Sequence, residues 1–503
     1  MNHLFDGLLG HQDPASPFAV DHDGPVRDLT YADVHDLSGR LASALVSMGV
    51  EPGDRVAAQV PKSIDALMLY LATVRAGGVF LPLNTAYTAA EIDYFVGDAT
   101  PRVLVADPVH SHELAPIASR HGASLATLGV GEGSLLDARA PAGSHFAPVP
   151  RAADDLAAIL YTSGTTGRSK GAMLTHDNLL SNALTLESAW AFTAADKLIH
   201  ALPIFHTHGL FVATNTVLRA GASLHFLHKF DAERVIALMA QATCLMGVPT
   251  FYTRLLKAPG LAEAAKGMRL FVSGSAPLLA ETHRDFEAIT GQAILERYGM
   301  TETNMNTSNP YDGARRAGTV GPPLPGVEVR ITDPASEGTE LLQGETGMIE
   351  VRGPNVFKGY WNMPEKTAEE KRADGWFITG DLGLIDADGY VHIVGRAKDL
   401  IISGGFNVYP KEVELAIDEM DGVVESAVIG VPHPDFGEAV VAVVVPAASG
   451  APDAAAIEAA LKQTLARYKQ PKHIAFTEAL PRNTMGKVQK VALRDEFSNI
   501  FKS

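Results

Sequence analysis

The sequence of 503 residues contains a single cysteine, Cys244, so no disulfide can form within the chain. It lacks an apolar run of the roughly 20 residues that a membrane-spanning helix needs, and its N-terminus lacks the pattern of a secretory signal. Basic residues are scarcer than acidic ones, 41 against 58, and the formal net charge is -17. This charge disfavours binding to nucleic acid or to an anionic membrane. Together these absences favour a cytoplasmic protein whose cysteine is a small buried residue.

The composition is that of a globular protein, with 46% hydrophobic and 20% charged residues. The chain is too long for one hydrophobic core. Helix-like and strand-like segments alternate over 1–394, which predicts an α/β domain with layered subdomains. Within it, about 327–394 shows short strands separated by Gly and Asp-Gly turns, typical of a small barrel-like β unit. We place a boundary at 395–399 and a compact α+β domain at 400–503.

The strongest local pattern is a loop rich in glycine and hydroxyl side chains, which follows a predicted strand at 156–161. Its glycines let the backbone approach an anion, its hydroxyl and N–H groups can bond phosphate oxygens, and Lys170 adds positive charge. Its spacing matches neither the Walker A pattern nor G-x-G-x-x-G. On composition alone, a surface turn remains the alternative. The expected phosphate-binding residues are Thr162, Ser163, Gly164, Thr165, Thr166, Gly167 and Lys170.

This loop resembles the phosphate loop of the adenylate-forming superfamily, which includes acyl-CoA synthetases, adenylation domains of peptide synthetases and beetle luciferases. Further segments resemble other core motifs of that superfamily and follow in the same order. Each segment alone is weak, because most such segments are ordinary turns. Their order over about 160–490 leaves little room for chance. The segments are 273–277, 298–303, 379–381, 395–405 and 481–487.

The resemblance implies a set of nucleotide contacts. Tyr298 would stack on adenine, Thr301 would contact the α-phosphate, and Glu302 would hold Mg²⁺, which prefers carboxylate and phosphate oxygens. Thr165 is a second expected ligand of the metal. Asp381 would accept hydrogen bonds from both ribose hydroxyls. The remaining expected contacts to the nucleotide are Ser275, Ala276, Pro277, Gly299, Met300 and Arg396.

The resemblance also implies that the small C-terminal domain is mobile and rotates about a hinge at 395–399, with Lys398 at the pivot. Lys487 would contact the carboxylate and the α-phosphate during adenylation and then swing away. Gly404 and Gly405 would then line the channel for CoA. The implied reaction is ATP-dependent ligation of an acid to CoA through an acyl-adenylate. Acylation of Lys487 would remove its charge, so this lysine is also a candidate regulatory site.

The segment 203–210 is expected to border the acyl pocket, with the catalytic His206 beside the reacting carboxylate. Amino-acid-activating relatives have an aspartate in this motif, and none is present here. A metal site formed by His206 and His208 is a weaker alternative, because the sequence offers no further ligands nearby.

Residues 295–298 and 303–306 look most like those of malonyl-CoA synthetases. A dicarboxylic acid would bring a second carboxylate into the pocket, and a buried carboxylate needs a cation, ideally arginine. We expect Arg284 to be this cation, although a helix that buries Phe286 could equally turn Arg284 to solvent. The alternative cations are Arg297, Arg315 and Arg316.

The sequence therefore predicts a ligase for malonate and methylmalonate, in which Thr207 and Met305 limit the size of the C2 substituent. Another monocarboxylic acid, transfer to a carrier protein instead of CoA, and a luciferase-like oxygenase remain alternatives. ATP, CoA and a small carboxylic acid are the expected partners, and a monomer is favoured.

Overall fold

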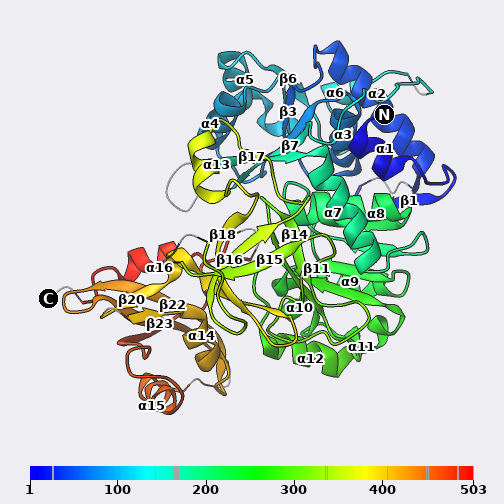
Figure 1. Ribbon diagram of the computed structural model, residues 1–503. Coiled ribbons are helices and arrows are strands. Elements are labelled where there is room, and N and C mark those ends of the chain that lie inside the picture. The colour runs from blue at the N-terminus through cyan, green and yellow to red at the C-terminus, as the bar shows by residue number, and fades with distance from the viewer. Residues whose placement is uncertain are drawn as a thin grey trace.

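The computed structural model describes most of the chain, as a large α/β part followed by a smaller C-terminal part (Figure 1). Three helices begin at a threonine capping box, at Thr30, Thr88 and Thr175, because the hydroxyl satisfies a free backbone N–H of the first turn. The described residues are 1–24, 28–141, 143–162, 169–334, 336, 338–404, 406–448, 450, 452–483 and 486–501.

A seven-stranded sheet carries the phosphate loop at one of its connections. In sheet order its strands are β17 (Gly359–Tyr360), β8 (Lys170–Thr175), β7 (Leu156–Thr162), β4 (Val79–Pro82), β3 (Arg55–Gln59), β5 (Val103–Ala106) and β6 (Ser124–Thr127). Strands β3 to β6 pair in parallel, and β7 pairs antiparallel with β8 across the phosphate loop. Every residue of β4 and β5 is buried, as expected for parallel strands that are covered on both faces.

An eight-stranded sheet supplies the other half of the large domain. In order its strands are β14 (Asn304–Ser308), β13 (Leu295–Met300), β12 (Leu270–Ser273), β11 (Cys244–Gly247), β9 (Lys197–His200), β10 (Ser223–Phe226), β1 (Pro17–Asp21) and β2 (Asp28–Thr30). Strands β9 to β13 are parallel, so their carboxyl ends meet at one edge. The segments that follow β9, β12 and β13 therefore lie together, which is where open α/β sheets bind ligands.

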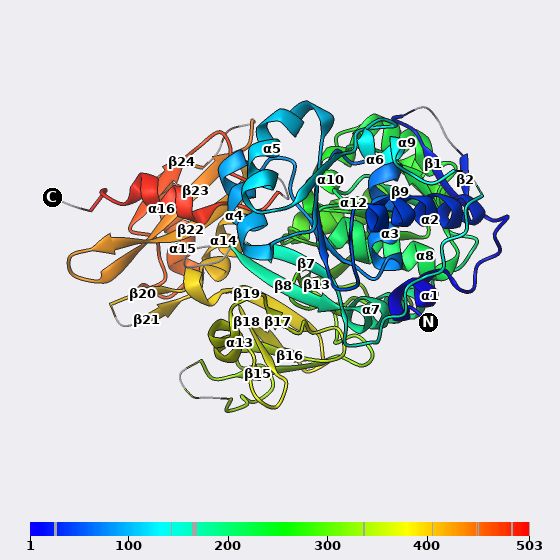
Figure 2. The ribbon, with the colours of Figure 1, turned by 90° about the horizontal axis from the view of Figure 1, so that it is seen from above.

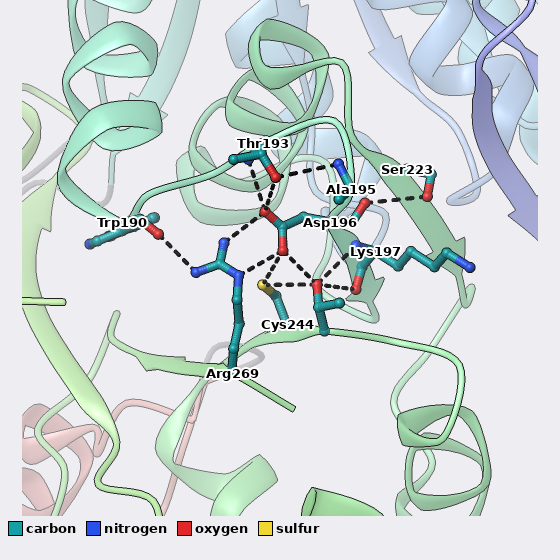
Figure 3. Close-up of polar contacts among 9 residues, drawn as sticks. Trp190, Thr193, Ala195, Asp196, Lys197, Ser223, Cys244 and Arg269 are labelled. Carbon is teal, nitrogen blue, oxygen red and sulfur yellow. Dashed lines mark hydrogen bonds and ion pairs between the residues drawn. The ribbon is translucent and has the colours of Figure 1, made fainter. Parts of the chain in front are cut away.

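A buried ion pair joins the opposite ends of the same strands (Figure 3). Asp196, just before β9, accepts two hydrogen bonds from Arg269, just before β12, at 2.6 and 2.8 Å. Thr243 donates to the same carboxylate at 2.8 Å, and the Cys244 thiol lies 3.7 Å from it. Burial raises the pKa of Cys244 to about 12, so this thiol is a structural group.

A four-stranded antiparallel sheet follows, made of β15 (Glu328–Thr332), β16 (Gly347–Arg352), β18 (Phe377–Ile385) and β19 (Val391–Arg396). The C-terminal part contains β20 (Ile401–Ser403), β21 (Phe406–Val408), β22 (Val423–His433), β23 (Gly437–Pro446) and β24 (His473–Phe476), with α14 (Pro410–Asp418), α15 (Ala454–Thr464) and α16 (Lys490–Phe497). Figure 2 shows this part, coloured orange to red, beside the sheet of β18 and β19.

The remaining helices belong to the large α/β part. They are α1 (His3–Leu9), α2 (Tyr31–Ser47), α3 (Ile64–Arg75), α4 (Ala89–Ala99), α5 (Ser111–Arg120), α6 (Ser134–Asp137), α7 (His176–Ala189), α8 (Asn215–Ala220), α9 (Ala232–Met239), α10 (Pro249–Leu255), α11 (Leu261–Ala264), α12 (Ala280–Thr290) and α13 (Pro364–Glu370). The predicted fold class, a large layered α/β domain with a small α+β C-terminal domain, is confirmed. Within the described ranges, no helix has the length and apolar character needed to cross a membrane.

Candidate active site

A cavity of about 500 Å³ lies between the carboxyl ends of the two large sheets and two residues of the C-terminal part, Asn483 and Lys487. Residues that lie more than 300 positions apart in the sequence line this cavity together. The predicted site residues that line it are Thr162, Lys170, His206, Thr207, Ser275, Gly299, Met300, Thr301, Glu302, Met305, Arg396, Lys398 and Lys487.

Several predicted residues do not line this cavity. Tyr298 and Asp381 lie directly beside it, since their neighbours Gly299 and Gly380 form part of the wall. Ala276, Pro277 and Gly404 are also not among its lining residues. Ser163, Gly164, Thr165, Thr166, Gly167 and Gly405 lie outside the described residues.

The phosphate side of the cavity contains two carboxylates that share one tyrosine hydroxyl. Tyr360 lies 3.1 Å from Glu302 Oε1 and donates to Glu370 Oε2 at 2.6 Å. Thr162 Oγ1 donates to Glu302 Oε1 at 3.4 Å. Burial raises the pKa of Glu302 above its ordinary value, whereas Lys170 donates to both oxygens of Glu370. Sequence reasoning missed Tyr360 and Glu370, because only the pairing of β17 with β8 brings them to Lys170.

Asp381 binds two protein donors on the nucleotide side. The Tyr298 hydroxyl donates to Oδ2 at 2.5 Å, and Arg396 Nε lies 2.6 Å from Oδ1. Asp381 pairs with Arg396 across β18 and β19, so the register of this sheet determines the contact. Burial, and then the adjacent Asp381 carboxylate, raise the pKa of Tyr298, which keeps its hydroxyl protonated. Each carboxylate oxygen retains a second lone pair for a ligand hydroxyl.

Neutral histidines line the part of the cavity formed by residues 206–208, Ser275 and Arg297. We call this part the acid side, because the sequence predicts that the acid binds beside His206. Burial and then the charge of Arg297 lower the pKa of His206 to about 4, and they also lower that of His208. His206 Nδ1 accepts the backbone N–H of His208 at 3.2 Å, so the proton of the neutral His206 ring is on Nε2. His208 Nδ1 lies 3.2 Å from the hydroxyl of Ser275. Ser275 has a φ of 72°, a strained conformation for a non-glycine residue and one that tends to occur at functional sites.

Arg297 provides a buried positive charge at the cavity. Its side chain lines the cavity and the residue is only 3% exposed. In the described part of the chain, neither Nε nor Nη2 has a hydrogen-bond partner. Burial lowers the pKa of Arg297 to about 9, because the loss of water around the guanidinium outweighs the opposite effects of Tyr252 and Glu296. A β-carbon at Gly274 would overlap this guanidinium, so only glycine leaves room for it.

The expectation for Arg284 is wrong. Helix α12 buries Thr282, His283 and Phe286, and the helical period turns Arg284 to solvent, away from the cavity. Of the alternative cations, Arg315 donates to backbone carbonyls and Arg316 forms an ion pair with Asp388. Arg297 is the predicted arginine that the structure brings into the acid side of the cavity.

Lys487 lines the cavity: part of the residue is exposed to solvent, while its ammonium is surrounded by protein. Its backbone N–H donates to Asn483 Oδ1 at 2.9 Å, in a turn at Gly486. Loss of solvent around its ammonium and the nearby charge of Arg396 lower the pKa of Lys487 to about 8. Burial also lowers the pKa of Lys398. The two lysines and Arg396 therefore concentrate positive charge where the C-terminal part meets the large domain.

A second cavity of about 630 Å³ adjoins the first, with Pro82 and Phe205 lining both. Its walls are largely apolar, and Lys62 is one of the charged groups in them. Lys62 Nζ donates to the backbone carbonyl of His200 at 2.9 Å and lies 3.0 Å from its Nδ1. The second cavity thus meets the first beside His206, the residue that follows Phe205.

Residues 10–361 match the family of AMP-binding enzymes, and residues 412–487 match the C-terminal domain of AMP-binding enzymes. The chain therefore belongs to the AMP-binding enzyme family, and the resemblance inferred from its motifs is confirmed.

Three similar proteins indicate which reaction of this family the chain catalyses. A feruloyl-CoA synthase from Amycolatopsis sp is 39% identical over 495 residues, which cover 95% of this chain and 96% of the relative. The malonate–CoA ligase of Arabidopsis thaliana is 36% identical over 497 residues, covering 92% of this chain and 81% of the relative. ATP-bound MatB from Rhodopseudomonas palustris is 61% identical, with a TM-score of 0.97 over 100% of both chains. The chain is an ATP-binding, AMP-forming acyl-CoA ligase.

Proposed function

We propose that the enzyme converts malonate, ATP and CoA to malonyl-CoA, AMP and pyrophosphate. The observation that carries this proposal is the buried guanidinium of Arg297 in the acid side of the cavity, whose Nε and Nη2 have no hydrogen-bond partner in the described part of the chain. A buried charge without a partner costs stability, and a dicarboxylic acid would supply the missing partner. One carboxylate would pair with Arg297 while the other meets the α-phosphate beside His206.

The size of the acid follows from the residues near Arg297. Thr207 and Met305 are 2% exposed and line the same cavity. We assign them the limit on the C2 substituent, because a methyl group at C2 of malonate would have to fit against them. Methylmalonate is therefore the proposed second substrate.

Positive charge has to offset the repulsion between the carboxylate and the triphosphate. Lys170 and the phosphate loop would hold the β- and γ-phosphates, and Lys487 would contact both reacting groups. Thr301 and Met300 would lie along the α-phosphate. Asp381 would hold the ribose through its remaining lone pairs, and Tyr298, which it orients, would pack against adenine.

Mg²⁺ fits this site on one observation: Glu302 is a buried carboxylate whose pKa is raised by burial, so a cation beside it would stabilise its charge. No group of three acidic, histidine or cysteine side chains within the described ranges could hold a metal ion. Phosphate oxygens would therefore complete its ligands, with Glu302 and Thr165 from the protein. The ion would supply charge neutralisation at the phosphates.

CoA would reach the acyl-adenylate from the second cavity, whose walls are largely apolar and which shares Phe205 with the first. We propose that residues 395–399 act as the hinge, with Lys398 at the pivot. Rotation there would withdraw Lys487 and bring Gly404 and Gly405 towards the thiol.

The test is CoA-dependent AMP formation with malonate, methylmalonate, succinate, ferulate and octanoate. We expect malonate to have the highest kcat/KM. A lead for ferulate would favour the aryl-acid activity of the feruloyl-CoA synthase relative and refute the dicarboxylate proposal. AMP formation that needs a carrier protein instead of CoA would overturn the choice of acceptor.

A further inference from the structure

Glu370 ends α13 at the wall of the cavity and receives three donor groups at once. Lys170 Nζ donates to both of its oxygens, at 2.9 and 3.0 Å. The Tyr360 hydroxyl donates to Oε2 at 2.6 Å, and Lys366 Nζ lies 3.0 Å from Oε1. Although burial opposes it, these donors hold the pKa of Glu370 below its ordinary value, so the carboxylate is ionised.

The pair between Lys170 and Glu370 is shielded from solvent. Their side chains are 12% and 24% exposed, and Lys170 Nζ lies 4.1 Å from the centre of the Tyr360 ring. Such a pair is stronger than an exposed one, because water and salt screen it less. Lys170 is also the lysine proposed to bind the triphosphate.

An ammonium has three donors, and both oxygens of Glu370 already engage Lys170. One N–H of the ammonium is then left for another ligand, so a phosphate that takes more than this one donor must weaken the pair. We propose that Glu370 competes with the phosphates for Lys170. It pairs with Lys170 in the ligand-free enzyme, loses this pair when the triphosphate binds, and forms it again as pyrophosphate leaves. Glu370 is a positioning residue in this inference, which rests on the proposed binding of phosphates in this cavity.

Competition of this kind has a consequence for product release. Pyrophosphate carries several negative charges and would leave a purely cationic site slowly. A carboxylate that pairs again with Lys170 lowers the affinity for pyrophosphate. The positive charge of Lys170 nevertheless remains available during adenylation. Glu370 therefore favours turnover at the expense of ground-state binding.

The experiment measures pyrophosphate binding by calorimetry in the presence of Mg²⁺, with the full-length enzyme. Glu370→Gln keeps the shape and a hydrogen bond to Tyr360 but removes the charge, and Glu370→Ala removes the side chain. Glu369→Gln is the matched control, because Glu369 also accepts from Lys366, at 2.8 Å, and is exposed. The pair Lys170→Met and Lys170→Met/Glu370→Gln completes a double-mutant cycle.

We expect Glu370→Gln and Glu370→Ala to tighten pyrophosphate binding about 5- to 30-fold, the scale of one charge-assisted hydrogen-bonded pair. Inhibition of AMP formation by pyrophosphate should strengthen in parallel. Glu369→Gln should change binding less than about twofold, as expected for an exposed charge. In the Lys170→Met background, Glu370→Gln should tighten binding much less, because only the direct repulsion between Glu370 and pyrophosphate is then removed.

Unchanged or weaker binding in the Glu370 variants overturns the inference, and so does equal tightening without Lys170. Normal binding of ATP and pyrophosphate by the wild type in such a case leaves the proposed function intact. A wild type that binds neither ligand would instead refute the proposed phosphate site itself. Thermal unfolding of each variant shows whether the fold is retained, and the calorimetry is interpreted for the folded ones.

Discussion

Substitution of Arg297 by methionine tests the acid side of the site most directly. Arg297 is 3% exposed, and two of its nitrogens have no partner in the described part of the chain. Methionine fills a similar volume without the charge. Malonate would then bury one carboxylate without a cation, a loss of about 2–5 kcal/mol, or roughly 30- to 4,000-fold in kcat/KM.

In Arg297→Met the stability of the fold should not decrease, although the activity does. Removal of an uncompensated buried charge is neutral or stabilising, so Arg297→Met should unfold at the same temperature as the wild type or higher. Saturating malonate should raise the unfolding temperature of the wild type but not that of the variant. ATP alone should stabilise both proteins, because Arg297 lies on the acid side of the cavity.

Arg284→Ala is the matched control, since Arg284 is an exposed arginine on α12. Its kcat/KM for malonate should stay within about twofold of the wild type, as is usual for a surface substitution. The reasoning is refuted if Arg297→Met retains malonate activity, or if Arg284→Ala loses it selectively. In either case the cation that binds the second carboxylate lies elsewhere.

Three further substitutions test other parts of the structure. Gly274→Ala should lower kcat/KM for malonate about tenfold or more by displacing Arg297, with ATP binding retained in calorimetry. Lys487→Ala should slow adenylation by about 10²–10⁴, whereas thioester formation from supplied acyl-adenylate should survive in a coupled assay. Wild-type adenylation should fall as the pH rises through about 8, because Lys487 then loses its proton. Asp196→Asn should lower the free energy of unfolding by about 3 kcal/mol, because Arg269 loses its carboxylate partner. The pKa of Asp196 is lowered in the folded protein, so the difference in unfolding free energy between wild type and variant should shrink as the pH falls below about 4.

Many of the residues that line the cavity could be predicted from the sequence because they lie in short contiguous motifs. Strand β7 leads into the phosphate loop, and β13 ends at the turn that carries Glu302. In each case neighbouring residues supply the backbone path and the side chains, so spacing along the chain is informative. The contact of Asp381 with Arg396 depends on cross-strand register, which spacing does not reveal.

The acid side could be predicted only in part, because its polarity depends on which face of an element is buried. Arg284 and Arg297 are both close to the family motifs in sequence. The rotation of α12 sends Arg284 to solvent, while the space at Gly274 admits Arg297 to the cavity. A sequence pattern indicates a cation nearby, but the choice between two arginines requires the packing around them.

The sequence by itself determined the family, the alternation of helices and strands, and the order of the motifs, since these follow from local pattern and composition. Only the tertiary structure decided which of the candidate arginines is buried at the cavity. It also decided that Glu370 pairs with Lys170 across 200 residues of chain. The physical reason is that burial and charge pairing depend on neighbours in space, and chain folding brings these neighbours together from distant segments.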